Sequence, residues 1–294
     1  PAARVGSARK NWPADRPPIA RRWLIAYAAG SVGMSAMPAL AAAAGAVIVG
    51  AAMLGWPGVG WPGFGAPATA AASATLASVT LPEALLRAAS AVPLAVLGAG
   101  FVYATLVIIS VRLLGLGLRE GHHPVRSRIG WQVWTTERIL DGARTLLFPV
   151  YASLITPLWL RMLGAKVGGG VEASTVLLIP ALTTIAPGAF LADDTMVGSY
   201  ELGGGWMHIG RTKIGRRAFL GNSGMAGPGR SVPRGGLVAV LSSTPRKSKR
   251  NSSWLGNPPT RLRRKATEFD EERTFHPLTR LRIARGAWEL LRLL

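Results

Sequence analysis

Cysteine is absent from the 294-residue sequence, and this absence limits the chemistry that the chain can perform. Disulfide bonds, thiolate metal sites and a cysteine nucleophile are excluded. Histidine is scarce as well, because only His122, His123, His208 and His276 are present, so a zinc site is not expected. Any reaction at this chain must therefore use oxygen or imidazole groups, and no bound metal is predicted.

Acidic residues are also few, with 14 aspartate and glutamate residues against 34 lysine and arginine residues. The formal net charge is +20, which favours an anionic partner. Nucleic acid, an acidic lipid surface and a phosphorylated cofactor all meet this requirement. Charge alone does not choose among them.

Charged residues are missing altogether between Arg22 and Glu83. Residues 23–54 form an Ala-, Gly- and Val-rich run that is long enough to cross a bilayer with some tilt. A second uncharged run, 88–111, reaches about 36 Å as a helix, against a hydrocarbon thickness of roughly 30 Å. The stretch between them, 55–80, contains two Trp-Pro-Gly sequences typical of turns at the membrane interface. We therefore predict two transmembrane helices, at about 23–54 and 88–114.

Basic residues flanking the two runs indicate their orientation. Arg16, Arg21 and Arg22 precede the first run, Arg112 and Arg119 follow the second, and the connecting stretch has none. Because cytoplasmic flanks are enriched in Lys and Arg, both ends are expected in the cytoplasm. The prediction is an integral protein of the cytoplasmic membrane, with a cytoplasmic N-terminal segment (1–22) and a transmembrane helical hairpin (23–119). A signal peptide and a buried helical pair in a soluble protein are the alternatives.

Residues 120–166 are predicted to form amphipathic or interfacial helices. In 130–142, Trp131, Trp134 and Ile139 recur at helical spacing, so this helix is expected to dock the following domain onto the membrane. The uncharged run 145–160 is too short to span, at about 24 Å as a helix. A kinked segment in the cytoplasmic interface and a core helix both remain open for it.

A six-residue period begins at Val167. Every sixth residue is apolar or a glycine, and the residue that follows it is small. This pattern fits neither a helix nor a simple strand alternation, and it predicts a left-handed parallel β-helix of hexapeptide repeats, about four coils long, over 167–245. The apolar positions are Val167, Ala173, Ile179, Ile185, Leu191, Val197, Gly203 and Ile209, and after a one-residue slip the register resumes at Ile214 and Leu220. Such coils can also serve purely as a scaffold.

The repeat is interrupted where Glu201 and Met207 occupy inward positions that Thr183, Ala189 and Thr195 fill elsewhere. The stretch GSYELGGGWMHIG, 198–210, is typical of a loop over a cleft. A histidine beside a glutamate can act as general base toward an amine or hydroxyl attacking a thioester. His208 is therefore the first candidate base, with Glu201 as its orienter. An outward coil position for His208 is the plainer alternative, and a solvated corner is the plainer alternative for Asp193 and Asp194.

The last predicted segment, 246–294, combines a basic exit loop with a C-terminal helix at 281–294. Its basic side chains are suited to the phosphates of a phosphorylated cofactor, to anionic lipid or to nucleic acid. The scarcity of interleaved aromatic residues argues against nucleic acid. The basic side chains are Arg246, Lys247, Lys249, Arg250, Arg261, Arg263, Arg264 and Lys265.

Leu255-Gly256-Asn257-Pro258-Pro259-Thr260-Arg261 resembles the exit loop of hexapeptide-repeat acyltransferases. In that superfamily the loop lies near the pantetheine arm of acyl-CoA, and a histidine from a neighbouring subunit deprotonates the acceptor. The resemblance implies acyl transfer from a pantetheine thioester. It also implies donor contacts from Gly256, Asn257, Arg261, Arg263 and Lys249, and a homo-oligomer, expected to be a trimer.

Nearly the whole chain resembles the membrane-bound C-terminal part of ε-poly-L-lysine synthetase-type nonribosomal peptide synthetases. The resemblance is carried by the helical pair and by the stretches 123–168, FLADDTMVGSYELGGGW (190–206), IGRTKIGRRAFLGNSGM (209–225) and SSWLGNPPTRLRR (252–264). In that family an adenylation domain and a carrier domain load an amino acid as a phosphopantetheine thioester. These loading parts are missing here, so a fragment or a separate aminoacyl carrier partner is implied. His123, within the first stretch, is the second candidate base.

The predicted function is a membrane-tethered acyl or aminoacyl transferase module that joins a pantetheine-thioester-activated amino acid to an amine. No cofactor is expected to be bound permanently, because the phosphopantetheine thioester, on a carrier protein or as acyl-CoA, arrives as donor. A noncatalytic membrane anchor for a separate synthetase and an acyl-CoA-dependent hexapeptide-repeat acetyltransferase are the alternatives.

Overall fold

The computed structural model describes residues 12–18, 20–54, 80–198, 200–263 and 278–291. The chain divides into two compact units, one of residues 31–107 and the other of residues 1–30 and 108–294. The Trp-Pro-Gly sequences of the predicted connecting loop, together with Arg264, Lys265 and His276, lie outside the described residues.

The smaller unit is built from parts of two long helices, α1 (Arg22–Leu54) and α3 (Leu81–Leu114). Each is long and apolar enough to cross a membrane. Small residues line their contact: a Cβ on Gly45 would lie 3.1 Å from the Ala95 carbonyl oxygen, and one on Gly98 would lie 2.5 Å from Ile48 Cδ1. Close approach at glycine and alanine is typical of helices that associate in lipid.

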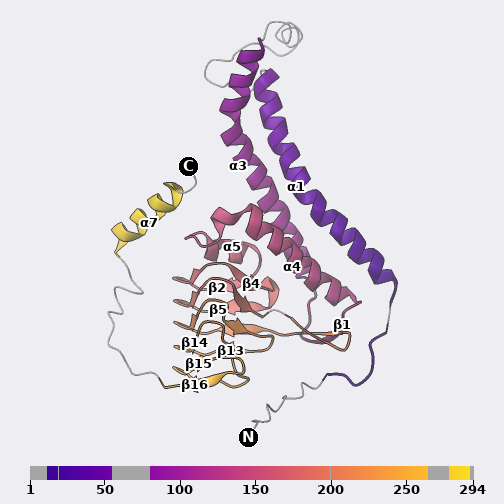
Figure 1. Ribbon diagram of the computed structural model, residues 1–294, viewed down its shortest axis with the longest axis vertical. Coiled ribbons are helices and arrows are strands. Elements are labelled where there is room, and N and C mark those ends of the chain that lie inside the picture. The colour runs from indigo at the N-terminus through magenta and orange to yellow at the C-terminus, as the bar shows by residue number, and fades with distance from the viewer. Residues whose placement is uncertain (1–11, 19, 55–79, 199, 264–277, 292–294) are drawn as a thin grey trace. The chain divides into compact units, whose positions relative to one another are not determined.

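The larger unit is dominated by a parallel β-helix whose strands stack as successive rungs (Figure 1). Two of its three faces are wholly parallel, and one of these carries β2 (Lys166–Val167), β5 (Thr183–Ile185), β10 (Thr212–Ile214) and β13 (Ser231–Val232). The other carries β4 (Val176–Leu178), β7 (Thr195–Val197) and β12 (Met225–Ala226). The remaining face carries β3 (Glu172–Ala173), β6 (Phe190–Leu191), β11 (Phe219–Leu220), β14 (Leu237–Val238) and β15 (Ser253–Leu255), and is closed by the antiparallel β16 (Thr260–Leu262).

The coils follow the predicted register through most of their length. Val167, Ile185, Ile214 and Val232 pair in turn along one face, so that branched apolar side chains stack inside the helix. Ile185, Ile214 and Val232 are each 1% exposed. The small residue after each apolar one is required by the next coil: a Cβ on Gly168 would lie 2.5 Å from the Pro187 nitrogen, and one on Gly215 would lie 2.5 Å from the Pro233 carbonyl carbon.

The register is wrong at Gly203 and Ile209, which lie outside the coils. They belong to an antiparallel hairpin of β8 (Glu201–Gly203) and β9 (Trp206–Ile209), in which Gly203 pairs with Trp206. Ile209 pairs instead with Gly121 of β1 (Gly121–Pro124). Paired Ile185 and Ile214 are therefore 29 positions apart, whereas Ile214 and Val232 are 18 apart. Glu201 and Met207 consequently do not occupy inward coil positions, and the six-residue spacing across the hairpin is a coincidence.

Short helices cover the first coils. The amphipathic segment predicted at 130–142 lies within α4 (Arg128–Leu146), whose Val133 packs with Ile179, Leu182, Met207 and Ile209 in one buried cluster. The run 145–160 contains the short η1 (Phe148–Val150) and enters α5 (Thr156–Met162), which contacts β2 and β3. Another short turn, η2 (Pro180–Leu182), precedes β5, and α7 (Thr279–Leu291) ends the described chain.

Candidate functional site

The hairpin and β1 form a three-stranded antiparallel sheet in the order β1-β9-β8. The register places Glu201, His208 and His122 side by side across the three strands. Because side chains alternate between the two faces of a strand, Met207 and Ile209 turn to the other face, where both are buried. The sequence thereby brings one carboxylate and two imidazoles together on the face opposite the core.

Glu201 and His208 form the predicted pair. His208 Nδ1 lies 3.5 Å from Glu201 Oε2, and the two side chains are 27% and 28% exposed. This distance is longer than a strong hydrogen bond, and such contacts often tighten when substrate binds. If Nδ1 carries the proton and faces the carboxylate, Nε2 is the nitrogen that can accept a proton.

His122 is a third member that sequence reasoning missed. Its ring stacks on that of His208 with the centroids 4.6 Å apart. Nothing in the local sequence identifies it, because its neighbour on the site is 86 positions further along the chain and is reached only through the pairing of β1 with β9. His123, the predicted alternative base, pairs in register with Met207 instead, and its Nε2 lies 2.7 Å from the Arg119 carbonyl oxygen.

The segment before α1 covers this face of the hairpin. The ring of Trp12 meets the rings of His122 and His208 edge-on, at centroid distances of 5.0 and 6.4 Å. Gly203 makes room for it, since a Cβ there would lie 2.7 Å from the indole ring. Trp206 Nε1 also donates to the Asp15 carbonyl oxygen at 2.9 Å. Trp12 was not among the residues expected at the site.

Tyr200 attaches the hairpin to α4. Its hydroxyl donates to Glu137 Oε2 at 2.6 Å, and the ring packs against the buried cluster around Val133. Burial raises the pKa of Tyr200, and the hydrogen bond to the Glu137 carboxylate raises it further. The phenol therefore stays protonated at neutral pH and acts here as a structural donor.

Arg230 brings a positive charge to the same region from the coil below. The position of a Cβ on Gly227 lies 3.5 Å from Glu201 Oε1, which places this carboxylate against the loop that leads to Arg230. Burial and the neighbouring Arg246 lower the pKa of Arg230, whereas Glu201 raises it. Glu201 thus interacts electrostatically with a guanidinium as well as with an imidazole, and Arg230 is another residue that the sequence did not single out.

The predicted donor-binding residues gather on the last rungs, away from the hairpin. The Gly256 amide donates to Ser242 Oγ at 2.8 Å, and Ser243 Oγ donates to Asn257 Oδ1 at 3.1 Å. Arg261 lies on β16 opposite Trp254, and Arg261, Arg263 and Lys249 are all exposed. Met225 bridges to Ser243, whose amide donates to the Gly256 carbonyl oxygen. Gly256 is therefore three rungs from β7, or about 14 Å at the usual strand spacing.

Comparison with known proteins supports the resemblance predicted from the sequence. No protein-family model matches the chain. It is 36% identical over 181 residues to a delta-poly-L-ornithine synthetase from Acinetobacter baumannii, a match that covers 60% of this chain and 14% of that protein. The chain therefore spans about a seventh of the length of the curated relative that it matches.

Solved structures similar to the chain include two acetyltransferases. A maltose O-acetyltransferase from Clostridium difficile is 11% identical, with a TM-score of 0.30 and coverage of 56% of this chain and 87% of that one. A hexapeptide-repeat acetyltransferase from Vibrio cholerae is 12% identical, with a TM-score of 0.32 and coverage of 54% and 89%. The assignment of the fold rests on the sheet topology described above.

Proposed function

We propose that this chain is a membrane-tethered transferase module that joins an amino acid, activated as a pantetheine thioester, to an amine. The observation that carries the proposal is the Glu201–His208 pair on a hairpin beside a parallel β-helix, in a chain 36% identical over 181 residues to a delta-poly-L-ornithine synthetase. The two long apolar helices supply the tether, and the basic flanks favour a β-helix on the cytoplasmic side of the cytoplasmic membrane.

His208 acts as general base in this reaction. The amine nitrogen attacks the thioester carbonyl carbon, a C–N bond forms, and His208 Nε2 takes a proton from the amine. The C–S bond then breaks, and the sulfur leaves as a thiol after receiving that proton. Glu201 orients the imidazole through Nδ1 and stabilises it while it is protonated.

The donor is expected to lie along the face that carries β7 and β12, with its phosphates at the exit loop. Lys249, Arg261 and Arg263 are exposed cations at that end and suit charge-assisted contacts with phosphate. A pantetheine arm is long and extended, so it can bridge the three rungs between Gly256 and the hairpin. Either an aminoacyl carrier protein or a CoA thioester can present this arm.

Self-association is part of the proposal. In cyclic oligomers of a β-helix, sites can form between neighbouring subunits, and a trimer of this chain would supply them. Sedimentation of the full chain in detergent at about micromolar concentration tests this point. A trimer is expected, and a monomer over the whole concentration range would reject it.

The packing of Trp12 favours a second candidate function, a noncatalytic anchor for a separate synthetase. An indole set edge-on against both imidazoles occupies space that an acceptor amine needs. In this alternative the cluster of rings only holds the N-terminal segment onto the hairpin, and the coils serve as a docking surface.

A thiol-release assay separates the two functions. The full chain in lipid nanodiscs receives ornithyl-pantetheine, ornithyl-CoA or a loaded carrier protein with free ornithine, because the relative's name makes ornithine the first amino acid to test. Released thiol is measured with a chromogenic disulfide, and the absence of cysteine removes any background from the protein. Peptide product is confirmed by mass spectrometry.

The transferase proposal predicts that His208→Ala lowers kcat/KM by about 100-fold or more, the usual range for loss of a general base. Glu201→Gln should give a smaller loss, and Lys213→Ala, which changes an outward side chain of β10, is the matched control. If His123→Gln removes activity while His208→Ala retains it, the assignment of the base is wrong. If the wild-type chain transfers from none of the three donors, the anchor function is favoured.

A further inference from the structure

Among the described residues, none covers the apolar face of the helix α7. None of the residues of α7 is buried, although the helix is rich in large apolar side chains. The exposed side chains are Leu281, Ile283, Trp288, Leu290 and Leu291, each between 52% and 67% exposed. A wide apolar face of this kind, with Arg280 and Arg282 among its neighbours, is typical of helices that lie in a membrane interface.

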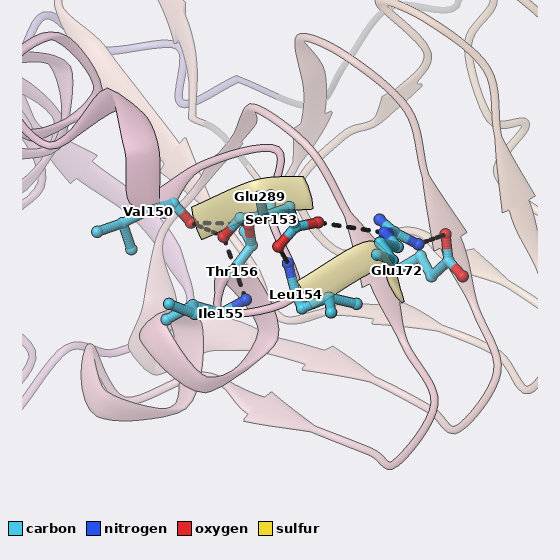
Figure 2. A network of polar contacts seen from close by, with 8 residues as sticks. Val150, Ser153, Leu154, Ile155, Thr156, Glu172 and Glu289 are labelled. Carbon is cyan, nitrogen blue, oxygen red and sulfur yellow. Dashed lines mark hydrogen bonds and ion pairs between the residues drawn. The ribbon is translucent and has the colours of Figure 1, made fainter. Parts of the chain in front are cut away.

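Polar contacts fix which side of α7 faces the protein (Figure 2). Glu289 Oε2 accepts a hydrogen bond from the Leu154 amide at 2.9 Å, and Arg285 Nη1 lies 3.3 Å from Glu172 Oε2 on β3. Arg285 Nε also lies 3.1 Å from Glu289 Oε1, which ties the two anchoring side chains together. Exposed ion pairs contribute little stability, so these contacts serve mainly to orient the helix.

The segment that α7 contacts is apolar and exposed as well. The run 145–160 contains no charge, and it is attached to the first coil by buried Trp159 and Leu160. A Cβ on Gly286 would lie 3.9 Å from Leu154 Cδ1, so α7 lies against this segment at Gly286. The outward apolar side chains of residues 146–162 are Leu146, Phe148, Leu154, Ile155, Leu158 and Met162, each between 41% and 54% exposed.

The final turn of α3 is hydrogen-bonded to this apolar segment. Arg112 Nε donates to the Met162 carbonyl oxygen at 2.7 Å, and Arg112 Nη2 donates to that of Arg161 at 3.0 Å. The apolar segment is therefore bonded to the end of a helix that is long and apolar enough to cross a membrane. Ile109 and Leu113, near the end of the same helix, are 52% and 60% exposed, so this part of α3 is apolar and exposed as well. Contiguous apolar surface of this extent marks contact with another phase or partner.

We infer that residues 146–162 and α7 together form a platform that lies in the interfacial layer of the membrane, with lipid as its occupant. Arg280, exposed in the first turn of α7, suits anionic headgroups. The platform holds the first coil, and hence the face carrying the Glu201–His208 hairpin, at a fixed height against the bilayer. This inference rests on the membrane tether of the proposed function, and it is independent of catalysis.

Because the chain has no cysteine, single cysteines can be introduced and labelled with an environment-sensitive fluorophore. Leu158→Cys and Ile283→Cys probe the platform, Arg282→Cys is the control on the polar side of α7, and Lys213→Cys is the control on the β-helix. The full chain is reconstituted in vesicles of phosphatidylcholine and phosphatidylglycerol, with and without lipids brominated at the upper acyl chain. No substrate is needed.

Bromolipid should remove most of the emission at positions 158 and 283 and leave position 213 unchanged, with position 282 intermediate. Glu289→Ala should lessen quenching at 283 and preserve it at 158, because only α7 loses its anchor. Equal quenching at 283 and 213 would overturn the platform, and so would probes shielded from aqueous iodide only at high protein concentration, which indicates a second copy. If the protein fails to float with vesicles, the tether itself is wrong; if it floats but bromolipid leaves the probes at 158 and 283 unquenched, only this inference fails.

Discussion

Gly215 provides a test of why a small residue must follow each apolar residue of the coils. A Cβ at this position would lie 2.5 Å from the Pro233 carbonyl carbon and 2.6 Å from the Arg234 nitrogen. Both atoms belong to the backbone of the next coil, and the Gly215 amide already donates to the Val232 carbonyl oxygen at 2.7 Å. Gly215→Ala must therefore push two hydrogen-bonded coils apart.

The expected cost combines two opposing effects. Overpacking typically costs 1–3 kcal/mol, so about 2 kcal/mol is taken here. Replacing glycine by alanine at a compatible backbone stabilises by about 0.4–1 kcal/mol through the unfolded chain. The difference between these two effects is a net loss of about 1–2 kcal/mol. Ala186 occupies the same position one coil earlier, which shows that a methyl group fits where the next coil permits it.

Gly169→Ala is the matched control, since a Cβ there meets nothing within 4 Å. Thermal unfolding of the full chain in detergent, followed by tryptophan fluorescence, compares the two variants with the wild type. For a unit of this size 1 kcal/mol shifts Tm by about 2–4 °C, so Gly215→Ala should lower Tm by about 2–8 °C. A Tm for Gly215→Ala equal to or above that of Gly169→Ala would refute the steric argument.

Two further predictions concern the hairpin. Tyr200→Phe removes the hydrogen bond to Glu137 and should cost about 1 kcal/mol, the low value reflecting partial exposure. Because the folded pKa of Tyr200 is raised above its usual 10.0, this phenol contributes stability fully below about pH 10 and loses it as pH rises further. Between about pH 8 and pH 11, Tm should therefore fall less steeply with rising pH for the variant than for the wild type. The same dependence of Tm on pH for both proteins would contradict the assignment. Gly203→Val should displace the Trp12 ring, which lies 2.7 Å from the Cβ position, and increase diethyl pyrocarbonate modification of His122 and His208 by mass spectrometry; unchanged modification means that Trp12 does not cover them.

Local sequence patterns predict the elements that depend on contacts between neighbouring turns or rungs. Apolar residues at every sixth position and the small residues after them predict the coils, because both constraints arise between neighbouring rungs. The helix α1 matches its prediction within one residue. By contrast, α3 begins at Leu81 rather than 88, since Glu83 and Arg87 pair within the helix and charge ends an apolar run without ending a helix.

The hairpin of β8 and β9 is a part of the fold that local sequence patterns did not predict. Gly203 and Ile209 keep the six-residue spacing by coincidence, and only the pairing of Ile209 with Gly121 reveals that they leave the coils. Glu201 and His208 were predicted together because both lie in the interruption. His122 and Trp12 reach the site through contacts over long sequence separations, and the alternation that puts His122 rather than His123 beside His208 depends on a register that no local pattern reveals.

Ile185 and Ile214 are 29 positions apart, against 18 for Ile214 and Val232, because the hairpin lies between the first two. The rungs before and after the hairpin stay in phase, since Ile185 pairs with Ile214 as directly as Ile214 pairs with Val232. The hairpin is thus an insert that the solenoid does not need for its own continuity. The coil register therefore places no constraint on the length of the hairpin, whereas Met207 and Ile209 still pack it against Ile179 and Leu182.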